Sequence, residues 1–289
     1  MMNTRLISVL ISGLFLVACQ KEAPNSPAST ENKTSSTAVE TGMISPQVDV
    51  APRPAFNANW KTYTFATEPN YPPLEYRNKN TEIIGFETDI LYAVAESAQF
   101  NVKLEAIPLA NFDATLSNKQ ADAWISGLIL SDELQKKVAV SQPFLENSVV
   151  VGVLDKPENA NIKTINDLKD KGISVSAYYP PDMKDLAKQI SNNKMTERRS
   201  IYLSLQSVFK GETVGVLAED RALQYFEKIH DEKNGLKFRF IPTNAPKHQL
   251  VFGVAQDNPE LLAQIDKGLS AIKANGSYDK IVNKWFGTK

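Results

Sequence analysis

The chain has very few of the side chains that build metal centres, disulfides and nucleophilic active sites. Its 289 residues include one cysteine, Cys19, and two histidines, His230 and His248. A single cysteine forms no disulfide within the chain, and two histidines leave almost nothing for a metal site or a Cys/His catalytic pair. We therefore expect no metal, no other cofactor and no Cys/His catalysis.

An excess of charge of either sign is also missing. The formal net charge is -1 and the isoelectric point is about 6.2. A protein that binds nucleic acid normally shows a basic excess, so we expect no nucleic-acid partner. Hydrophobic residues make up 42% of the chain, which is ample for a core, and the length allows one large or two modest domains.

The apolar run at the N-terminus is too short to span a membrane comfortably as a permanent helix. Arg5 precedes a run from Leu6 to Val17, a pattern typical of a signal-peptide core. The run ends in Leu16-Val17-Ala18-Cys19, which resembles the lipobox of bacterial lipoproteins, where the cysteine is acylated and becomes the first mature residue. The resemblance implies a signal peptide over residues 1–18 and lipid attachment at Cys19. A buried structural cysteine is the alternative.

Large apolar side chains are scarce in the segment that follows. Up to about Asn59 it is rich in Ser, Thr, Asn, Pro, Glu and Lys, and such a segment buries too little surface to offset its ordering entropy. We predict a disordered tether over residues 19–59, which would give an anchored domain reach. In the alternative, Pro46 to Phe56 packs on the domain as an ordered arm.

From Trp60 onwards, strand-like and helix-like segments alternate. The first unit has strands at 63–67, 102–107 and 121–126 and helices at 88–99 and 111–118. The second has strands at 173–176, 214–218 and 238–242 and helices at 183–191, 204–210 and 221–228, before a final helical pair. A nearly all-β-branched run over 148–154 reads as a long strand passing between the units. This alternation predicts an α/β protein with parallel pairing.

Two loops follow the carboxyl ends of predicted strands, at Glu68 to Tyr76 and at Ser126 to Ser131. In an open α/β sheet such loops surround a ligand crevice, because helices cover both faces of the sheet. Prolines stiffen the first loop, so its tyrosines have little entropy left to lose on binding. The alternative for each aromatic residue is a packed core edge.

Several motifs occur here in a fixed order. They are Tyr71-Pro72-Pro73-Leu74-Glu75-Tyr76, Gly85-Phe86-Glu87-Thr88-Asp89-Ile90, Ala121-Asp122-Ala123, Gln142-Pro143-Phe144 and a closing segment that ends in Lys284-Trp285-Phe286-Gly287. The ordered set resembles the polar amino-acid family of bacterial extracellular solute-binding proteins, the receptors that feed ABC importers. The match covers roughly Tyr63 to Gly287.

The resemblance implies a two-lobe type II periplasmic-binding-protein (Venus-flytrap) fold, in which hinge strands join two open sheets. It implies a first lobe made of residues 60–151 and 247–289 and a second lobe made of residues 152–246. It further implies a monomeric receptor in the periplasm or cell envelope that closes on a small solute and delivers it to an ABC permease in the inner membrane.

The groups with which this family usually holds an α-carboxylate are missing. Leu134 stands where the family has an arginine, and Ile129 stands where it has a small hydroxyl residue. In the second lobe Tyr178-Tyr179-Pro180-Pro181 replaces a Gly-Ser-Thr type turn, and proline has no N–H to donate. We therefore expect an amino-acid-like ligand, such as an amine or a carboxyl-modified derivative, unless Arg198, Arg199 or Arg221 supplies a substitute cation.

The amine side of the site is better retained. The family places an acid after a second-lobe strand, where Glu219 aligns best and Asp220 follows. Beside aromatic side chains these acids would bind an ammonium group through charge pairing and cation–π contact. The predicted ligand-binding residues are Glu68, Tyr71, Phe86, Trp124, Ser126, Gly127, Tyr178, Tyr179, Glu219 and Asp220. Alternatively, Glu219 and Asp220 only cap the helix that follows.

Two other functions remain open on the same fold. A dehydratase-like periplasmic enzyme would use the acids and tyrosines for general acid–base work, although the sequence has no nucleophile–base spacing and no phosphate loop. A sensory lipoprotein that no longer serves transport would tolerate the departures at Ile129, Leu134 and Pro180.

Overall fold

The computed structural model describes residues 53–234 and 237–287. These residues all fall within one compact unit, Ile44–Lys289. The predicted signal peptide, Cys19 and most of the predicted tether lie outside the described residues. Among the described helices, none is long and apolar enough to cross a membrane.

A five-stranded sheet forms the first lobe, in the order β5-β1-β6-β15-β7. Its parallel part consists of β1 (Thr62–Thr67), β5 (Asn101–Ala106) and β6 (Ala123–Trp124). Two short strands run antiparallel to β6 or to each other, β7 (Ala139–Val140) and β15 (Gly253–Val254). Within this sheet, the predicted parallel pairing is therefore confirmed for the first three strands.

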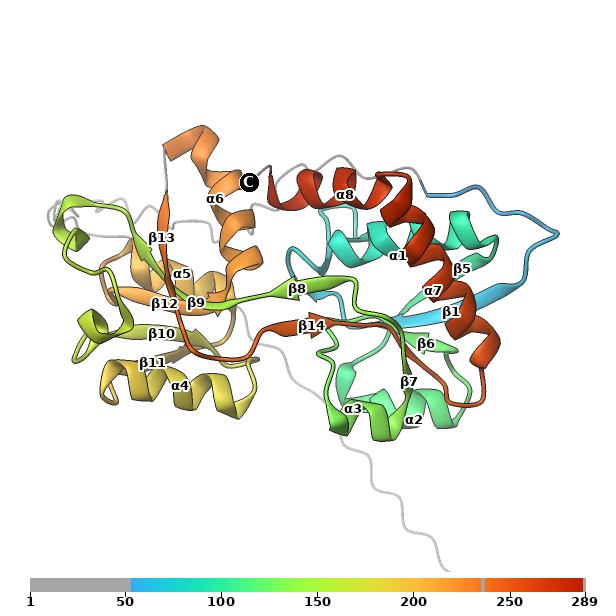
Figure 1. Cartoon of the computed structure of the whole chain (residues 1–289), viewed down its shortest axis with the longest axis horizontal. Coiled ribbons are helices and arrows are strands. Elements are labelled where there is room, and N and C mark those ends of the chain that lie inside the picture. Colours follow the sequence, from blue (N-terminus) through green and yellow to red (C-terminus); the bar gives the residue numbers. More distant parts are fainter. Residues whose placement is uncertain (1–52, 235–236, 288–289) are drawn as a thin grey trace, which may run out of the picture. The chain divides into compact units, whose positions relative to one another are not determined.

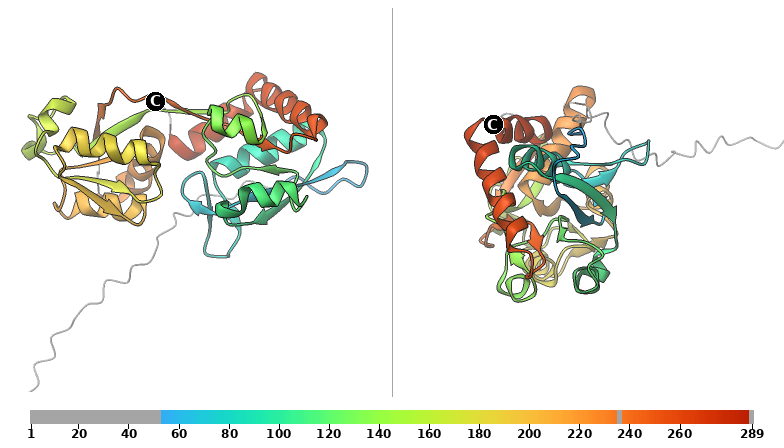
Figure 2. Two further views of the ribbon diagram at one scale, coloured as in Figure 1. Left: turned by 90° about the horizontal axis from the view of Figure 1, so that it is seen from below. Right: turned by 90° about the vertical axis from the view of Figure 1, so that its right-hand side faces the viewer.

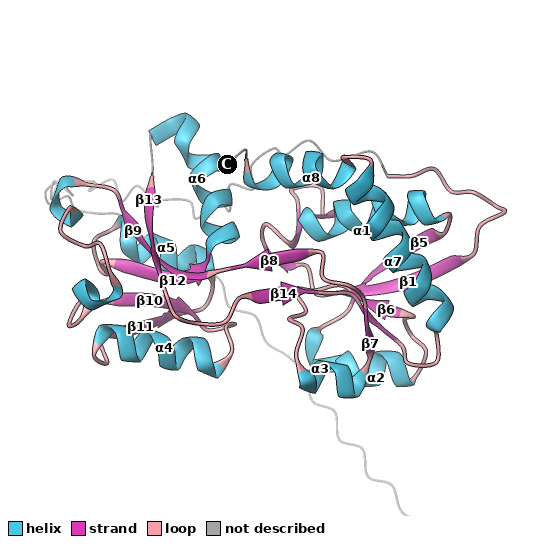
Figure 3. Cartoon of the chain, viewed as in Figure 1, coloured by secondary structure: helices cyan, strands magenta, loops and turns pink. Residues whose placement is uncertain are grey.

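Helices cover both faces of this sheet (Figures 1 and 3). One face packs on α1 (Phe86–Ala98), α7 (Pro259–Ala274) and α8 (Ser277–Phe286) in a large apolar cluster that includes Phe65 and Phe100. The other face carries α2 (Phe112–Ser117) and α3 (Asp132–Lys137), which contribute to a second apolar cluster around Trp124. The 3-10 helix η1 (Leu109–Asn111) directly precedes α2.

A second five-stranded sheet forms the second lobe, in the order β11-β10-β12-β9-β13. Three strands are parallel, β10 (Ile173–Ser176), β11 (Met195–Arg198) and β12 (Gly215–Glu219). β9 (Val149–Leu154) and β13 (Phe238–Pro242) complete it, with β9 antiparallel to both of its neighbours. The flanking helices are α4 (Pro181–Ser191), α5 (Ile201–Phe209), α6 (Asp220–Asn234) and the 3-10 helices η2 (Pro157–Asn159) and η3 (Ile165–Leu168).

The chain passes between the lobes twice, through β8 (Leu145–Asn147) and β14 (His248–Leu250). These two strands pair antiparallel, and Figure 2 shows the two connecting segments, green and orange-red, running side by side. The β-branched run that we expected to pass between lobes lies wholly inside the second sheet as β9, where all six residues are buried. The first crossing therefore ends before Val149.

The loop after β1 is held by its own small sheet of β2 (Asn70–Tyr71), β3 (Glu75–Arg77) and β4 (Ile83–Ile84). It packs tightly on the start of α1, where Gly85 has a φ of 150°. A Cβ atom at Gly85 would lie 2.0 Å from the carbonyl oxygen of Leu74. Only glycine fits this approach, so the loop keeps a fixed position over α1.

The described chain begins upstream of Trp60. The Asn57 amide donates to Asn101 Oδ1 at 3.0 Å, and the Asn101 side chain donates to the carbonyl oxygens of Asn57 and Trp60 at 2.9 Å. The Arg53 guanidinium lies over the ring of Tyr92 at 5.7 Å. The last part of the segment that we assigned to the tether therefore contacts the first lobe as an arm.

Candidate functional site

The two lobes and one crossing strand meet at the carboxylate of Glu219, the last residue of β12. Its exposed fraction is 4%. The Tyr71 hydroxyl, from the first lobe, donates a hydrogen bond to Oε2. The Tyr179 hydroxyl donates to the same oxygen at 3.1 Å, and His248 Nδ1, on β14, lies 3.1 Å from Oε1. We call these four residues the Glu219 cluster.

The tyrosines of this cluster are held as hydrogen-bond donors. Burial raises the pKa of Tyr71 well above its usual value, and the negative charge of Glu219 raises it further. Burial followed by the charge of Glu219 has the same effect on the pKa of Tyr179. Because the charged form of each phenol is disfavoured, both hydroxyls keep their protons and point them at the carboxylate.

Glu219 has no strong cation of its own. Among the residues that the structure describes, His248 is the only basic side chain within ion-pair distance of it. A pocket adjoins the carboxylate, lined by Tyr71, Pro73, Leu74, Asn147, Glu219, Arg221 and Ala222. The pocket measures about 10 Å³, which is water-sized. A solute as large as an amino acid would therefore enter only when the surrounding segments move apart.

The residues at the positions that the family uses for a carboxylate have other contacts here. Leu134 packs in the apolar cluster around Trp124, and Ile129 pairs with Leu250 in an isolated bridge. The amides that could cradle an anion are already used: Tyr178 N donates to Ser176 Oγ at 3.3 Å and Tyr179 N to the Ser176 carbonyl at 3.2 Å. Pro180 and Pro181, which follow at the start of α4, have no N–H.

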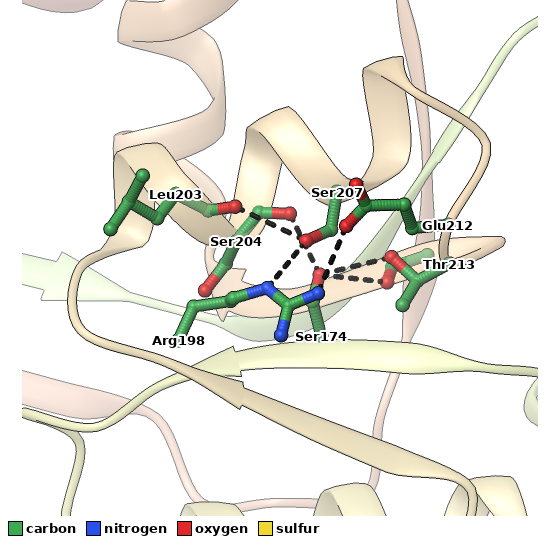
Figure 4. Close-up of polar contacts among 8 residues, drawn as sticks. Ser174, Arg198, Leu203, Ser204, Ser207, Glu212 and Thr213 are labelled. Carbon is green, nitrogen blue, oxygen red and sulfur yellow. Dashed lines mark hydrogen bonds and ion pairs between the residues drawn. The ribbon is translucent and has the colours of Figure 1, made fainter.

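The three arginines considered as substitutes occupy different environments. Figure 4 shows Arg198 engaged within the second lobe, where Nε donates to Ser207 Oγ at 2.8 Å and Nη2 pairs with Glu212 at 2.9 Å. Arg199 is exposed. Arg221 lies over the Phe286 ring at 5.4 Å and also lines the pocket beside Glu219. Of the three, Arg221 alone shares a pocket with the Glu219 carboxylate.

Phe86 and Trp124 do not line the pocket. Both side chains are fully buried. Phe86 packs between Phe144 and Phe286 at ring-centroid distances of 6.3 and 5.0 Å, and Trp124 packs on Phe112 at 5.4 Å. The structure assigns both rings to the core, although the sequence analysis placed them in the binding site.

Ser126 and Gly127 form a turn that faces inward. The Ser126 hydroxyl donates to Glu75 Oε1 at 3.2 Å, and the Gly127 amide donates to both carboxylate oxygens of Glu87 at 3.0 and 3.1 Å. Glu75 and Glu87 are 1% and 0% exposed. Hydrogen bonds to two buried acids thus hold the turn in place. The Gly127 amide is directed at Glu87 and not at the pocket.

The pKa values of Glu75 and Glu87 are both raised. Burial raises the pKa of Glu87 to about 7, against the hydrogen bond from Gly127, which lowers it. Burial raises the pKa of Glu75 well above its usual value, and the adjacent Glu87 charge raises it further. No Lys or Arg pairs with either acid within the described chain. Sequence reasoning assigned them no role, although Glu87 stands in the first turn of a helix, a position that favours carboxylates.

The remaining predicted residues are not part of the Glu219 cluster. Glu68 accepts the Leu109 amide and the Asn70 side chain, both at 2.7 Å. Asp220 caps the start of α6 by accepting the amides of Ser148 and Arg221. Tyr178 is 73% exposed. His248, which the sequence did not suggest as a site residue, completes the cluster from a crossing strand.

Two α/β lobes joined by two crossing strands define a type II periplasmic-binding protein. The chain belongs to the bacterial extracellular solute-binding proteins, family 3, whose model matches residues 63–288. This confirms the family and the fold that the motifs indicated.

Relatives and solved structures agree with this placement. The chain is 28% identical over 225 residues to an arginine-binding periplasmic protein of Mannheimia haemolytica, covering 77% of this chain and 90% of the relative. It is 26% identical to ABC transporter arginine-binding protein 1 of Escherichia coli K12, covering 77% and 89%. A solved structure of the ancestral amino acid-binding protein AncCDT-1, described as a precursor of cyclohexadienyl dehydratase, superposes with a TM-score of 0.62 at 24% identity, covering 78% and 95%. At that identity the last match shows the fold alone.

Proposed function

We propose that this chain is a lipid-anchored receptor that captures an amine-bearing, amino-acid-like solute and delivers it to an ABC permease in the inner membrane. The ammonium group of the solute would pair with Glu219, and the rings of Tyr71, Tyr178 and Tyr179 would surround it. The family supports the transport role, and relatives named for arginine binding support a cationic solute.

The observation that carries the proposal is the burial of the Glu219 carboxylate without a Lys or Arg partner. Its carboxylate is almost fully buried, and hydroxyls from both lobes converge on it, yet no Lys or Arg of the described chain pairs with it. A buried carboxylate normally has a cationic partner, because desolvating an unpaired charge is costly. A ligand ammonium would fill that place.

The proposed solute has no free α-carboxylate, or its α-carboxylate is bound by a group other than those that the family uses. The apolar packing of Leu134 and the prolines at the start of α4 leave no charge-assisted bonds at the positions that the family uses. Desolvating a carboxylate there would cost several kcal/mol, on the order of a buried unpaired ion. Arg221 is the cation that would bind it if a free amino acid were the ligand.

A thermal-shift panel on the full chain tests this proposal. Arginine, lysine and histidine are set against their decarboxylated and amidated counterparts. A ligand at about 100 times its Kd stabilises by about 2.7 kcal/mol, enough for a shift of a few degrees. We expect the amines to shift the melting temperature and the free amino acids not to. A strong shift with a free amino acid alone would contradict the proposed ligand class.

The anchor and the absence of catalysis belong to the same proposal. The mass of the mature protein would include acyl chains on Cys19, and a mature chain without them would refute the anchor. Incubation with each panel compound that binds should return it unchanged. A released product would favour the dehydratase-like alternative.

A further inference from the structure

Both oxygens of the Glu219 carboxylate already have hydrogen-bond partners within the protein. It accepts from the hydroxyls of Tyr71 and Tyr179, and His248 Nδ1 lies 3.1 Å from Oε1. A carboxylate can only accept, so Nδ1 carries the proton in this contact. Of the three donors, His248 is the one that can also carry a full positive charge near neutral pH.

The charges around His248 favour its protonation. Glu219 faces it from β12, and Asp182 faces it from the first turn of α4. Tyr71 and Tyr179 contribute neutral hydroxyls. Lys247, which immediately precedes β14, is paired with Glu146 on β8 at 2.6 Å. The hydrogen bond to Glu219 raises the pKa of His248 above 6.5, against burial, which lowers it.

We propose that His248 sets the affinity of the site: its imidazolium competes with the ligand's ammonium group for the Glu219 carboxylate, so that cationic solutes bind more weakly when His248 is protonated. This inference rests on the proposed function. An arriving ammonium group would take the place of one donor on Glu219, and with a protonated imidazolium present it would also meet a like charge at close range. Binding should therefore release one proton from His248.

The sign of the pH dependence follows from that proton release. Below the pKa of His248 the affinity should rise about tenfold per pH unit, and above it the affinity should level off. His248→Gln keeps an N–H donor for Glu219 but carries no charge. The variant should therefore bind with nearly constant affinity across the range, and more tightly than the wild type at low pH.

The test is calorimetric titration of the full chain with agmatine, the decarboxylated counterpart of arginine, from about pH 5.5 to 8.5. Wild type, His248→Gln and His230→Gln are compared. His230, the other histidine of the chain, packs on Phe209 with ring centroids 6.0 Å apart, so its variant should keep the wild-type pH profile.

A second measurement does not use a ligand. In the His230→Gln background the single histidine signal in NMR spectra belongs to His248, and adding Glu219→Gln should lower its titration midpoint. An unchanged midpoint would overturn the inference, as would equal pH profiles for agmatine in wild type and His248→Gln. Agmatine binding at no pH in any of the proteins would instead refute the ligand class of the proposed function, and this inference with it.

Discussion

Glu75 and Glu87 place two carboxyl groups against the turn at Ser126 and Gly127, without a cation between them. Both are buried, Ser126 and Gly127 donate to them, and Glu75 Oε2 has no hydrogen-bond partner as a bare carboxylate. Two like charges at such a site cannot both persist, so one group keeps a proton near neutral pH. A protonated Glu75 would supply the hydrogen that its second oxygen otherwise lacks.

This pair should make stability depend on pH. The pKa of Glu87 is raised from 4.5 to about 7, so its contribution to stability is fully present below pH 4.5 and is lost as the pH rises through 7. The loss would reach about 3 kcal/mol if the group titrated alone. Urea unfolding at a series of pH values should show the free energy of unfolding of the wild type falling towards pH 8. The free energy of unfolding of Glu87→Gln should change less with pH.

Glu96 supplies the control for that series. It is exposed on the same helix, α1, so Glu96→Gln should follow the wild-type curve. Parallel curves for wild type and Glu87→Gln would contradict the raised pKa of Glu87.

At the residue scale, the sequence predicted which chemistry to look for but not which way every side chain points. Tyr71, Tyr179 and Glu219 come together as expected. Phe86 and Trp124 belong to the core, because a motif shows where a residue lies along the chain and not which face of its helix or strand is covered. His248 escaped notice because none of the motifs that pointed to the site includes it, and only the fold brings β14 beside β12.

At the scale of elements, periodicity found most of the helices and the buried core strands, but not the short helix α3. It does not predict β11, because Met195-Thr196-Glu197-Arg198 is a half-polar edge strand. The run over β9 was recognised as a strand, but its place was wrong. A fully buried strand reads as continuously apolar whether it lies between lobes or at the centre of a sheet.

The packing of α7 on α1 gives a prediction at this scale. A Cβ atom at Gly268 would lie 2.8 Å from both the carbonyl oxygen and Cγ1 of Val94. Alanine gains about 1 kcal/mol in helix propensity over glycine, but overpacking typically costs 1–3 kcal/mol. Because backbone is one of the contacts, we expect Gly268→Ala to destabilise by about 1 kcal/mol in urea unfolding.

An exposed neighbour separates this effect from a general change in α7. Lys267→Ala should stay within about 0.5 kcal/mol of the wild type. A stabilised Gly268→Ala would mean that α1 and α7 separate at little cost.

At the scale of the whole described unit, the two lobes are joined by β8 and β14 and touch at Glu219. The return of the chain to the first lobe was expected from the family resemblance, since periodicity alone does not reveal a double crossing. A ligand at Glu219 would contact both lobes at once, and it would favour the closed form only by its differential affinity for that form.

The most direct measurement is therefore calorimetric titration of Glu219→Gln with the tightest amine from the thermal-shift panel. Asp220→Asn is the matched control, because the neighbouring acid caps α6 and asparagine caps equally well. Removing one partner of a buried charge pair costs 2–5 kcal/mol, so we predict affinity weaker by roughly 30-fold or more for Glu219→Gln and unchanged for Asp220→Asn. Equal affinities in wild type and Glu219→Gln would contradict the account.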